Sequence, residues 1–183
     1  MSTLASPFGL KPAFHPSGII RQSHTTIASA FGTDIFQFSP VRVAVDGTLE
    51  DAAAGEALIG AFMGVEFTRT DGRRAVANFW EAGTVATEIV AYYTEDPLII
   101  YEIQADAPFL QTAIGEQFDT TALAGNATTG LSSAALNIAS TAANAQLRAI
   151  GVNPAADNVI GDAFTIVQVQ ISDHQYVAVR AAI

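Results

Sequence analysis

The stretch GEALIGAFMGVEFTRTDGRRAVANFW, residues 55–80, decides the fold. Two runs rich in apolar, β-branched and aromatic residues flank residues 70–73 (TDGR), which have the composition of a hairpin turn. The stretch therefore predicts two antiparallel strands. Gly60 and Gly64 interrupt the first run, and this predicts β-bulges or close backbone approaches at these two positions.

Similar short runs continue on both sides of this hairpin. Residues 84–93 and 97–104 are rich in β-branched and aromatic residues and are separated by a turn, so they predict a second strand pair. Alternation of apolar and polar residues predicts further strands at 34–38, 41–45, 146–152, 162–172 and 174–183. We therefore expect an all-β barrel or sandwich of about nine short strands with long loops and at most one short helix.

The chain is long enough for one domain with an appended segment. We predict a single β domain over residues 34–183. Within it, residues 105–144 are dominated by Ala, Thr, Ser, Asn and Gly, and this composition predicts a loop-rich excursion. Residues 1–33 are predicted to form an extended N-terminal arm.

This arm differs from the rest of the chain in charge. It contains no Asp or Glu, and all 18 acidic residues follow it. Its prolines disfavour regular structure, and it is too apolar for a solvated tail, so we expect it to lie on a surface. That surface is either its own domain or a neighbouring subunit. The residues predicted to make this contact are Pro7, Phe8, Leu10, Pro12, Phe14, Ile19 and Ile20.

Composition excludes several classes of protein. The chain has no cysteine, which rules out disulfides and thiolate chemistry. A net charge of −10 with scattered arginines argues against a nucleic-acid partner. The longest apolar run, residues 57–65, is far too short to span a membrane as a helix, and no signal peptide is recognisable. We therefore expect a soluble protein that is used without export.

The sequence contains no recognisable catalytic motif. Its three histidines, His15, His24 and His174, lack the spacing of metal ligands, and the pairs Glu50-Asp51 and Glu95-Asp96 are expected to be solvated charges in turns. We predict no catalytic, metal or cofactor-binding residues, and a protein that binds rather than an enzyme.

Several strings resemble one family, the head decoration or cement proteins of tailed bacteriophages, which open with Ser-Pro-Phe-Gly-Leu-x-Pro. Here that motif is Ser6, Pro7, Phe8, Gly9, Leu10 and Pro12. Other similar strings are AAAGEALIGAF at 52–62, Gly-Val-Glu-Phe-Thr at 64–68, Asn78-Phe79-Trp80 with Gly83-Thr84, and DPLIIYEIQAD at 96–106. Towards the C-terminus they are QLRAIGV at 146–152, Pro154, Asp157-Asn158, residues 161–164 and His174-Gln175-Tyr176. The chain departs from the family where Phe38-Ser39-Pro40 replaces a frequent Gly-Asp-Pro.

The resemblance implies a virion structural protein on the outer capsid surface, assembled in the bacterial host cytoplasm. Its partner would be the major capsid protein, and it would act as a homotrimer that clamps neighbouring capsid subunits. Two alternatives stay open. One is another phage structural module of the tail or baseplate. The other is a small-ligand-binding β-barrel that uses Trp80 and nearby tyrosines.

Overall fold

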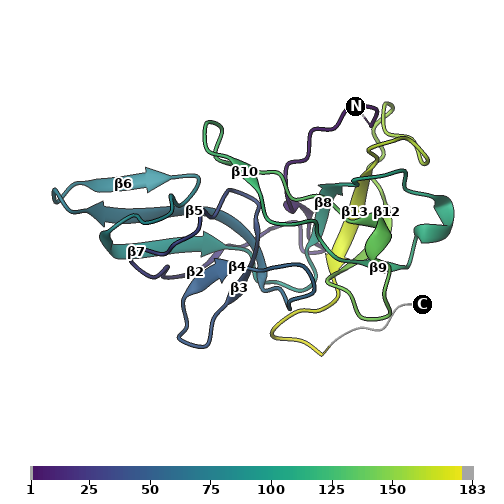
Figure 1. Cartoon of the computed structure of the whole chain (residues 1–183). Helices are drawn as coiled ribbons and strands as arrows, with labels where there is room; N and C mark the ends of the chain where they lie inside the picture. Colours follow the sequence, from purple (N-terminus) through teal and green to yellow (C-terminus); the bar gives the residue numbers. More distant parts are fainter. Residues whose placement is uncertain (1, 179–183) are drawn as a thin grey trace.

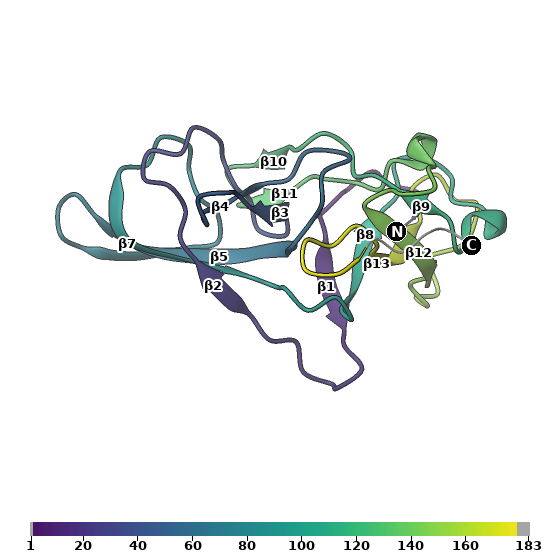
Figure 2. The same cartoon turned by 90° about the horizontal axis from the view of Figure 1, so that it is seen from below.

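The structure is a computed structural model that describes residues 2–178, and its regular secondary structure is almost entirely β-strand. One antiparallel sheet has the order β1-β8-β13-β12-β9. Its strands are β1 (Lys11–Phe14), β8 (Ile100–Gln104), β9 (Gln117–Phe118), β12 (Leu147–Val152) and β13 (Ile166–Ile171). Figures 1 and 2 show this sheet at one end of an elongated molecule. We call this end the C-terminal lobe.

The opposite end, the central lobe, contains a second antiparallel sheet with the order β2-β7-β5-β3-β4, and β6 pairs with β5. Its strands are β2 (Ser23–Thr25), β3 (Pro40–Val43), β4 (Leu49–Asp51), β5 (Gly60–Arg69), β6 (Arg74–Ala77) and β7 (Ala86–Tyr93). A separate hairpin pairs β10 (Gly125–Asn126) with β11 (Leu131–Ser132). The all-β prediction is confirmed, and the separate sheets are consistent with a sandwich.

Each lobe has its own apolar core. The core of the C-terminal lobe packs Tyr101, Phe109 and Phe118 with aliphatic residues of β8, β12 and β13. The core of the central lobe surrounds Trp80, whose ring meets that of Phe67 edge to face at 5.4 Å. Trp80 is completely buried in this core.

The predicted hairpin is present, since β5 and β6 pair through the turn around Gly72. Both glycine predictions are also confirmed. The β5–β7 register shifts between Phe62 and Gly64, as at a bulge. At Gly60, an added Cβ would lie 1.7 Å from the carbonyl oxygen of Thr94, so only glycine allows this close backbone approach.

The second predicted strand pair is wrong. Strands β7 and β8 both exist, but β7 belongs to the central lobe and β8 to the C-terminal lobe. The link between them does not turn back as a hairpin. Instead, the N–H of Thr94 bonds to the carbonyl oxygen of Ala61, which extends the pairing with β5, and the chain then crosses to the other sheet.

Two other predicted strands are not continuous. In residues 34–38 the backbone N–H groups bond to three different segments, at Trp80, Gly130 and Phe62, so no single ladder forms. The described part of residues 174–183 is a turn, in which His174 Nδ1 accepts a hydrogen bond from the N–H of Tyr176. Residues 179–183 of that predicted strand lie outside the described residues.

The excursion at 105–144 is mostly irregular. Besides β9, β10 and β11 it contains two three-residue 3-10 helices, η1 (Gln111–Ala113) and η2 (Ile138–Ser140), one more than expected. The short strands outnumber the expected nine, because pairs of two or three residues carry too little sequence pattern to be predicted. No helix among residues 2–178 is both long and apolar enough to cross a membrane.

Candidate contact surface

The first residues of the predicted arm are fixed to the C-terminal lobe. The N–H of Phe164 donates to the carbonyl oxygen of Ser2 at 2.7 Å. The side chain of Gln104 donates to the carbonyl oxygen of Leu4 at 3.0 Å and accepts from the N–H of Ser6 at 2.7 Å. Gln104 thus supplies both hydrogen bonds that a neighbouring strand would supply. The start of the chain is held in place without forming a strand itself.

Residues 9 and 10 are fixed even more tightly. The N–H of Leu10 bonds to the carbonyl oxygen of Phe38 at 2.7 Å, and the Leu10 side chain is fully buried in the core of the C-terminal lobe. At Gly9 (φ +80°), an added Cβ would lie 2.4 Å from that same oxygen. This part of the chain is therefore an integral piece of the fold.

Strand β1 then forms an edge of the sheet, with Pro12 opposite Tyr101 and Phe14 opposite Ile100. Proline has no N–H to donate, and such a position is tolerated on an edge strand. The Phe14 side chain is 53% exposed. An edge strand with an exposed aromatic ring is available for contact with another protein.

Residues 15–22 form a loop that leaves β1 and reaches β2 on the other sheet, where His24 pairs with Tyr92. Figure 2 shows this loop projecting from the body of the molecule. It is braced by His15, whose Nε2 lies 3.2 Å from Asp96 Oδ2, and by Ile20, which packs against the C-terminal core. Ile19 is 63% exposed. The loop therefore presents one apolar side chain while another anchors it.

The seven predicted contact residues thus separate into groups. Leu10 belongs to the core, and Ile20 packs against it. Pro7, Phe8 and Pro12 are half-buried. Only Phe14 and Ile19 are largely exposed. We call Phe14 together with residues 15–22 the projecting loop.

Sequence reasoning missed two neighbours of this loop. A hollow of about 330 Å³ is lined by Arg21 of the loop, by residues 95–97 and by Tyr176, and the Tyr176 side chain is 63% exposed. Leu98, directly after the hollow, is 45% exposed. Leu98 lies within the predicted strand at 97–104, so the sequence carried no signal for its exposure. Tyr176 carried no such signal either, because its segment also reads as a strand.

The charged residues on β5, β6 and β7 form a structural network. Arg74 Nη2 lies 3.2 Å from Glu66 Oε1, and Tyr92 Oη donates to the same oxygen at 2.8 Å. The hydrogen bond from Tyr92, with the charge of Arg74, lowers the pKa of the Glu66 carboxyl, and it raises the pKa of Tyr92. The two pKa shifts favour an ionised Glu66 carboxylate and a protonated Tyr92 hydroxyl. This network supports the sheet and presents no group poised to move a proton.

The prediction of solvated turn charges is wrong for Glu50 and Asp51, which lie on β4. Burial, with repulsion from Asp34 and Glu50, raises the pKa of the Asp51 carboxyl to about 7. Each of the three histidines makes its own contact: His15 with the Asp96 carboxylate, His24 with the ring of Tyr92, and His174 with the carbonyl oxygen of Glu95. Among residues 2–178, no group of three His, Asp or Glu side chains is placed to hold a metal ion.

Comparison of the chain with protein-family models, with curated proteins and with solved structures finds no match.

Proposed function

We propose that the chain is a virion structural protein that binds the outside of a bacteriophage capsid and stabilises it by clamping neighbouring major capsid proteins. One observation carries this proposal. The projecting loop exposes Phe14 and Ile19 on a segment that is anchored at both ends to two different sheets. Apolar side chains on a braced segment contribute to binding at a low entropic cost, because the segment is ordered before it meets its partner.

Two further features support the same function. The chain carries a net charge of −10, which keeps a protein soluble at the high concentrations at which virions assemble. The strings that resemble decoration proteins extend from the first residues to Tyr176, and the Ser-Pro-Phe-Gly-Leu string leads directly into β1. In that family, the loop would contact a capsid subunit or a second protomer.

The proposal is tested by mixing the purified protein with expanded capsid shells that lack it. We expect saturable binding on the outer surface and greater resistance of the shells to heat. Absence of saturable binding would contradict the proposal. Labelling the protein in intact particles then distinguishes a position on the head from one on the tail or baseplate. Density located only on the tail would contradict the capsid function and favour the alternative structural role.

The proposed homotrimer is tested separately, by measuring the oligomeric state. The mass of the protein in solution and on the shell gives the number of protomers in each state. We expect three protomers per site on the shell. A stoichiometry of one would remove the trimer from the proposal while leaving capsid binding in place.

A further inference from the structure

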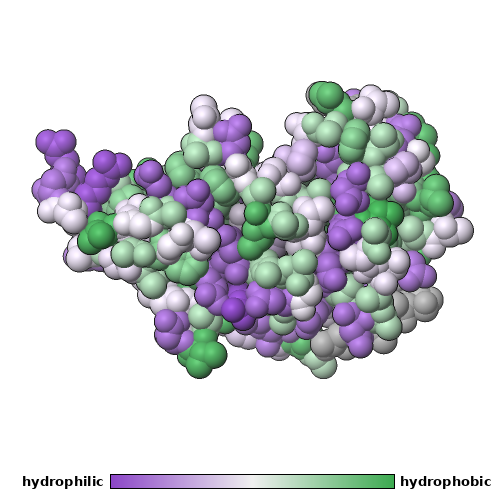
Figure 3. All heavy atoms as spheres, viewed as in Figure 1, coloured by the Kyte–Doolittle hydropathy of each residue, from purple (hydrophilic) through white to green (hydrophobic). Residues whose placement is uncertain are grey.

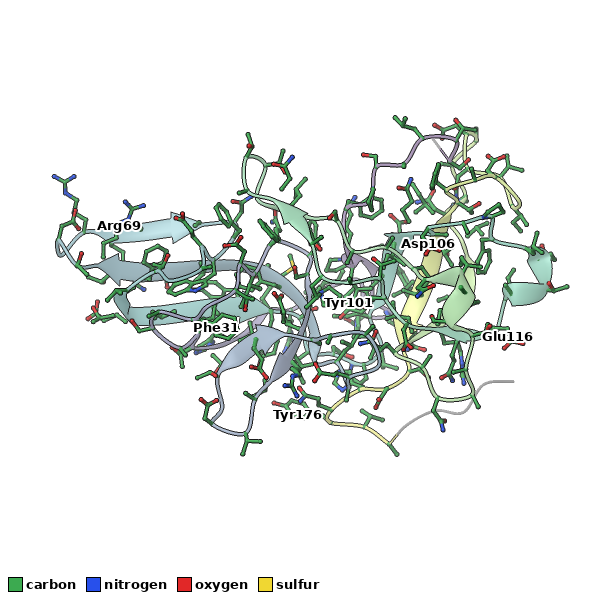
Figure 4. The ribbon with its side chains drawn as sticks, in the orientation of Figure 1. Phe31, Arg69, Tyr101, Asp106, Glu116 and Tyr176 are labelled. Carbon is green, nitrogen blue, oxygen red and sulfur yellow. The ribbon has the colours of Figure 1, made fainter. Side chains whose placement is uncertain are left out.

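A cleft of about 580 Å³ opens between β4, residues 31–36 and residues 123–125. It lies on the central lobe, away from the loop surface described above. Hydrophilic residues gather over β3 and β4 in the middle of the face shown in Figure 3. Figure 4 labels Phe31, which lines the cleft from the segment that precedes β3. The volume is in the range of cavities that hold small organic groups.

The charges that line the cleft do not balance. Asp34, Glu50 and Asp51 contribute carboxyl groups, and Arg42 is the one cation among the described lining residues. Arg42 is already engaged, since its Nη2 lies 2.6 Å from Glu50 Oε1 and its Nε lies 3.3 Å from Glu56 Oε2. No cationic side chain of the cleft is therefore left to neutralise Asp34 and Asp51.

Asp51 is the less satisfied of these two carboxyl groups. Asp34 Oδ1 accepts a hydrogen bond from the N–H of Ala82 at 2.7 Å. Asp51 Oδ1 is buried and has no hydrogen-bond partner within the described part of the chain. A buried acceptor without a donor costs free energy that an incoming donor would recover. The wall of the cleft thus lacks a donor at a defined position.

The remaining lining indicates what kind of donor fits. Phe31, Phe36 and Leu123 supply apolar walls. Such walls suit a group that carries its charge at the end of a methylene chain, and they suit a hydrated metal ion poorly. A guanidinium matches best, because it is weakly hydrated, stacks on aromatic rings and donates two parallel hydrogen bonds to carboxyl oxygens.

We propose that this cleft binds the guanidinium side chain of an arginine presented by a partner protein, with Asp34 and Asp51 as its acceptors. The site is distinct from the projecting loop, and it does not depend on the partner being a capsid protein. An arriving cation also offsets the repulsion among Asp34, Glu50 and Asp51. Binding of the arginine therefore strengthens as Asp51 loses its proton, between about pH 6 and pH 8. The other charged groups on this side of the lobe are Arg42 and Glu56, which pair with each other.

The test follows the backbone amide signals of the full, isotope-labelled chain by NMR. The probe is N-acetyl-arginine methylamide, and its neutral isostere N-acetyl-citrulline methylamide is the control at matched ionic strength. We expect saturable shifts in residues 31–36, 50–53 and 123–125 with the arginine probe. The citrulline probe should bind about tenfold more weakly or worse, because it lacks the charge.

Variants then assign the acceptors. Asp51→Asn and Asp34→Asn should each weaken arginine binding by about tenfold, while Asp71→Asn, which removes a carboxylate from the exposed β5–β6 turn, should change it less than about twofold. The Asp34→Asn side chain retains an oxygen that can accept from the N–H of Ala82, so this variant should fold even if the other does not. Equal binding of arginine and citrulline, no saturable shift, or shifts confined to other residues would overturn the proposal.

Discussion

Tyr101 Oη lies 2.9 Å from Thr94 Oγ1, and this buried contact joins the two lobes. Thr94 follows β7, and its Oγ1 also accepts a hydrogen bond from the N–H of Ala61 on β5 at 3.0 Å. Tyr101 is on β8 in the other sheet and is fully buried. The pair thus fixes how the chain passes from the central to the C-terminal lobe.

Removing the Tyr101 hydroxyl should lower stability. We expect Tyr101→Phe to reduce the free energy of unfolding by about 1–2 kcal/mol, because a buried hydrogen bond is lost. Tyr92→Phe is the matched control, since its hydroxyl bonds to Glu66 at the half-buried surface of the sheet. Urea denaturation measures both. Equal effects of the two substitutions would contradict the role assigned to the Tyr101 contact.

Gly60→Ala tests the close approach beside this contact. The new methyl group would collide with the carbonyl oxygen of Thr94, so β5 and the link after β7 must separate. We expect a loss of about 3 kcal/mol or failure to fold. Gly32→Ala is the control, because nothing lies within 4 Å of its added Cβ. Thermal unfolding of both variants measures the difference in stability. A Gly60→Ala protein as stable as the control would contradict the expectation, because it would show that the two backbones can move apart.

The raised pKa of the Asp51 carboxyl predicts an unusual dependence of the free energy of unfolding on pH. Its pKa is raised from 3.8 to about 7 in the folded chain, so the folded state holds a proton that the unfolded state has lost. Stability therefore falls as pH rises through this interval and levels off above about pH 7. Asp51→Asn should remove roughly 2–3 kcal/mol of the loss between pH 5 and pH 8. Asp71→Asn serves as the control, measured by urea denaturation at several pH values.

Parallel pH profiles for the wild-type and Asp51→Asn proteins would contradict this expectation. They would show that Asp51 is solvated or finds a donor in solution. The measurement uses the protein without any added cation, so its result is independent of the arginine proposal.

Leu10 and Ile19 belong to the same segment but should respond differently to substitution. We expect Leu10→Ala to lower the free energy of unfolding by about 3 kcal/mol, because its side chain is fully buried. Ile19→Ala should change it by less than about 0.5 kcal/mol, because that side chain is largely exposed. Denaturation curves of the two variants give the comparison. Similar losses would mean that the projecting loop is packed more closely than the structure shows.

The sequence predicts those elements whose partners are close along the chain. The β5–β6 hairpin could be predicted because its turn, with Gly72, lies between the two strands. The partner of β8 could not be predicted, since it pairs with β13, more than sixty residues away, and with β1. Turn chemistry after β7 suggested a hairpin, and only the pairing of Thr94 with β5 reveals the crossing.

The candidate site shows the same limit. Apolar composition predicts a contact region in the N-terminal segment, but Leu10 and Ile19 look alike in sequence. Their difference arises from long-range contacts, such as the bond from Leu10 to Phe38. The burial of Asp51 could not be predicted from the sequence either, because residues 31–36 and 123–125 come together around it only in the fold.

The central claim is that the exposed side chains of the projecting loop hold the protein on its partner. The most direct measurement compares the occupancy of capsid shells by the wild-type protein, by Phe14→Ser/Ile19→Ser and by the control Val45→Ser/Val76→Ser. The control removes two exposed apolar side chains elsewhere. We predict at least about a tenfold loss of affinity for the loop variant and little change for the control. Equal occupancy by all three folded proteins would contradict the claim.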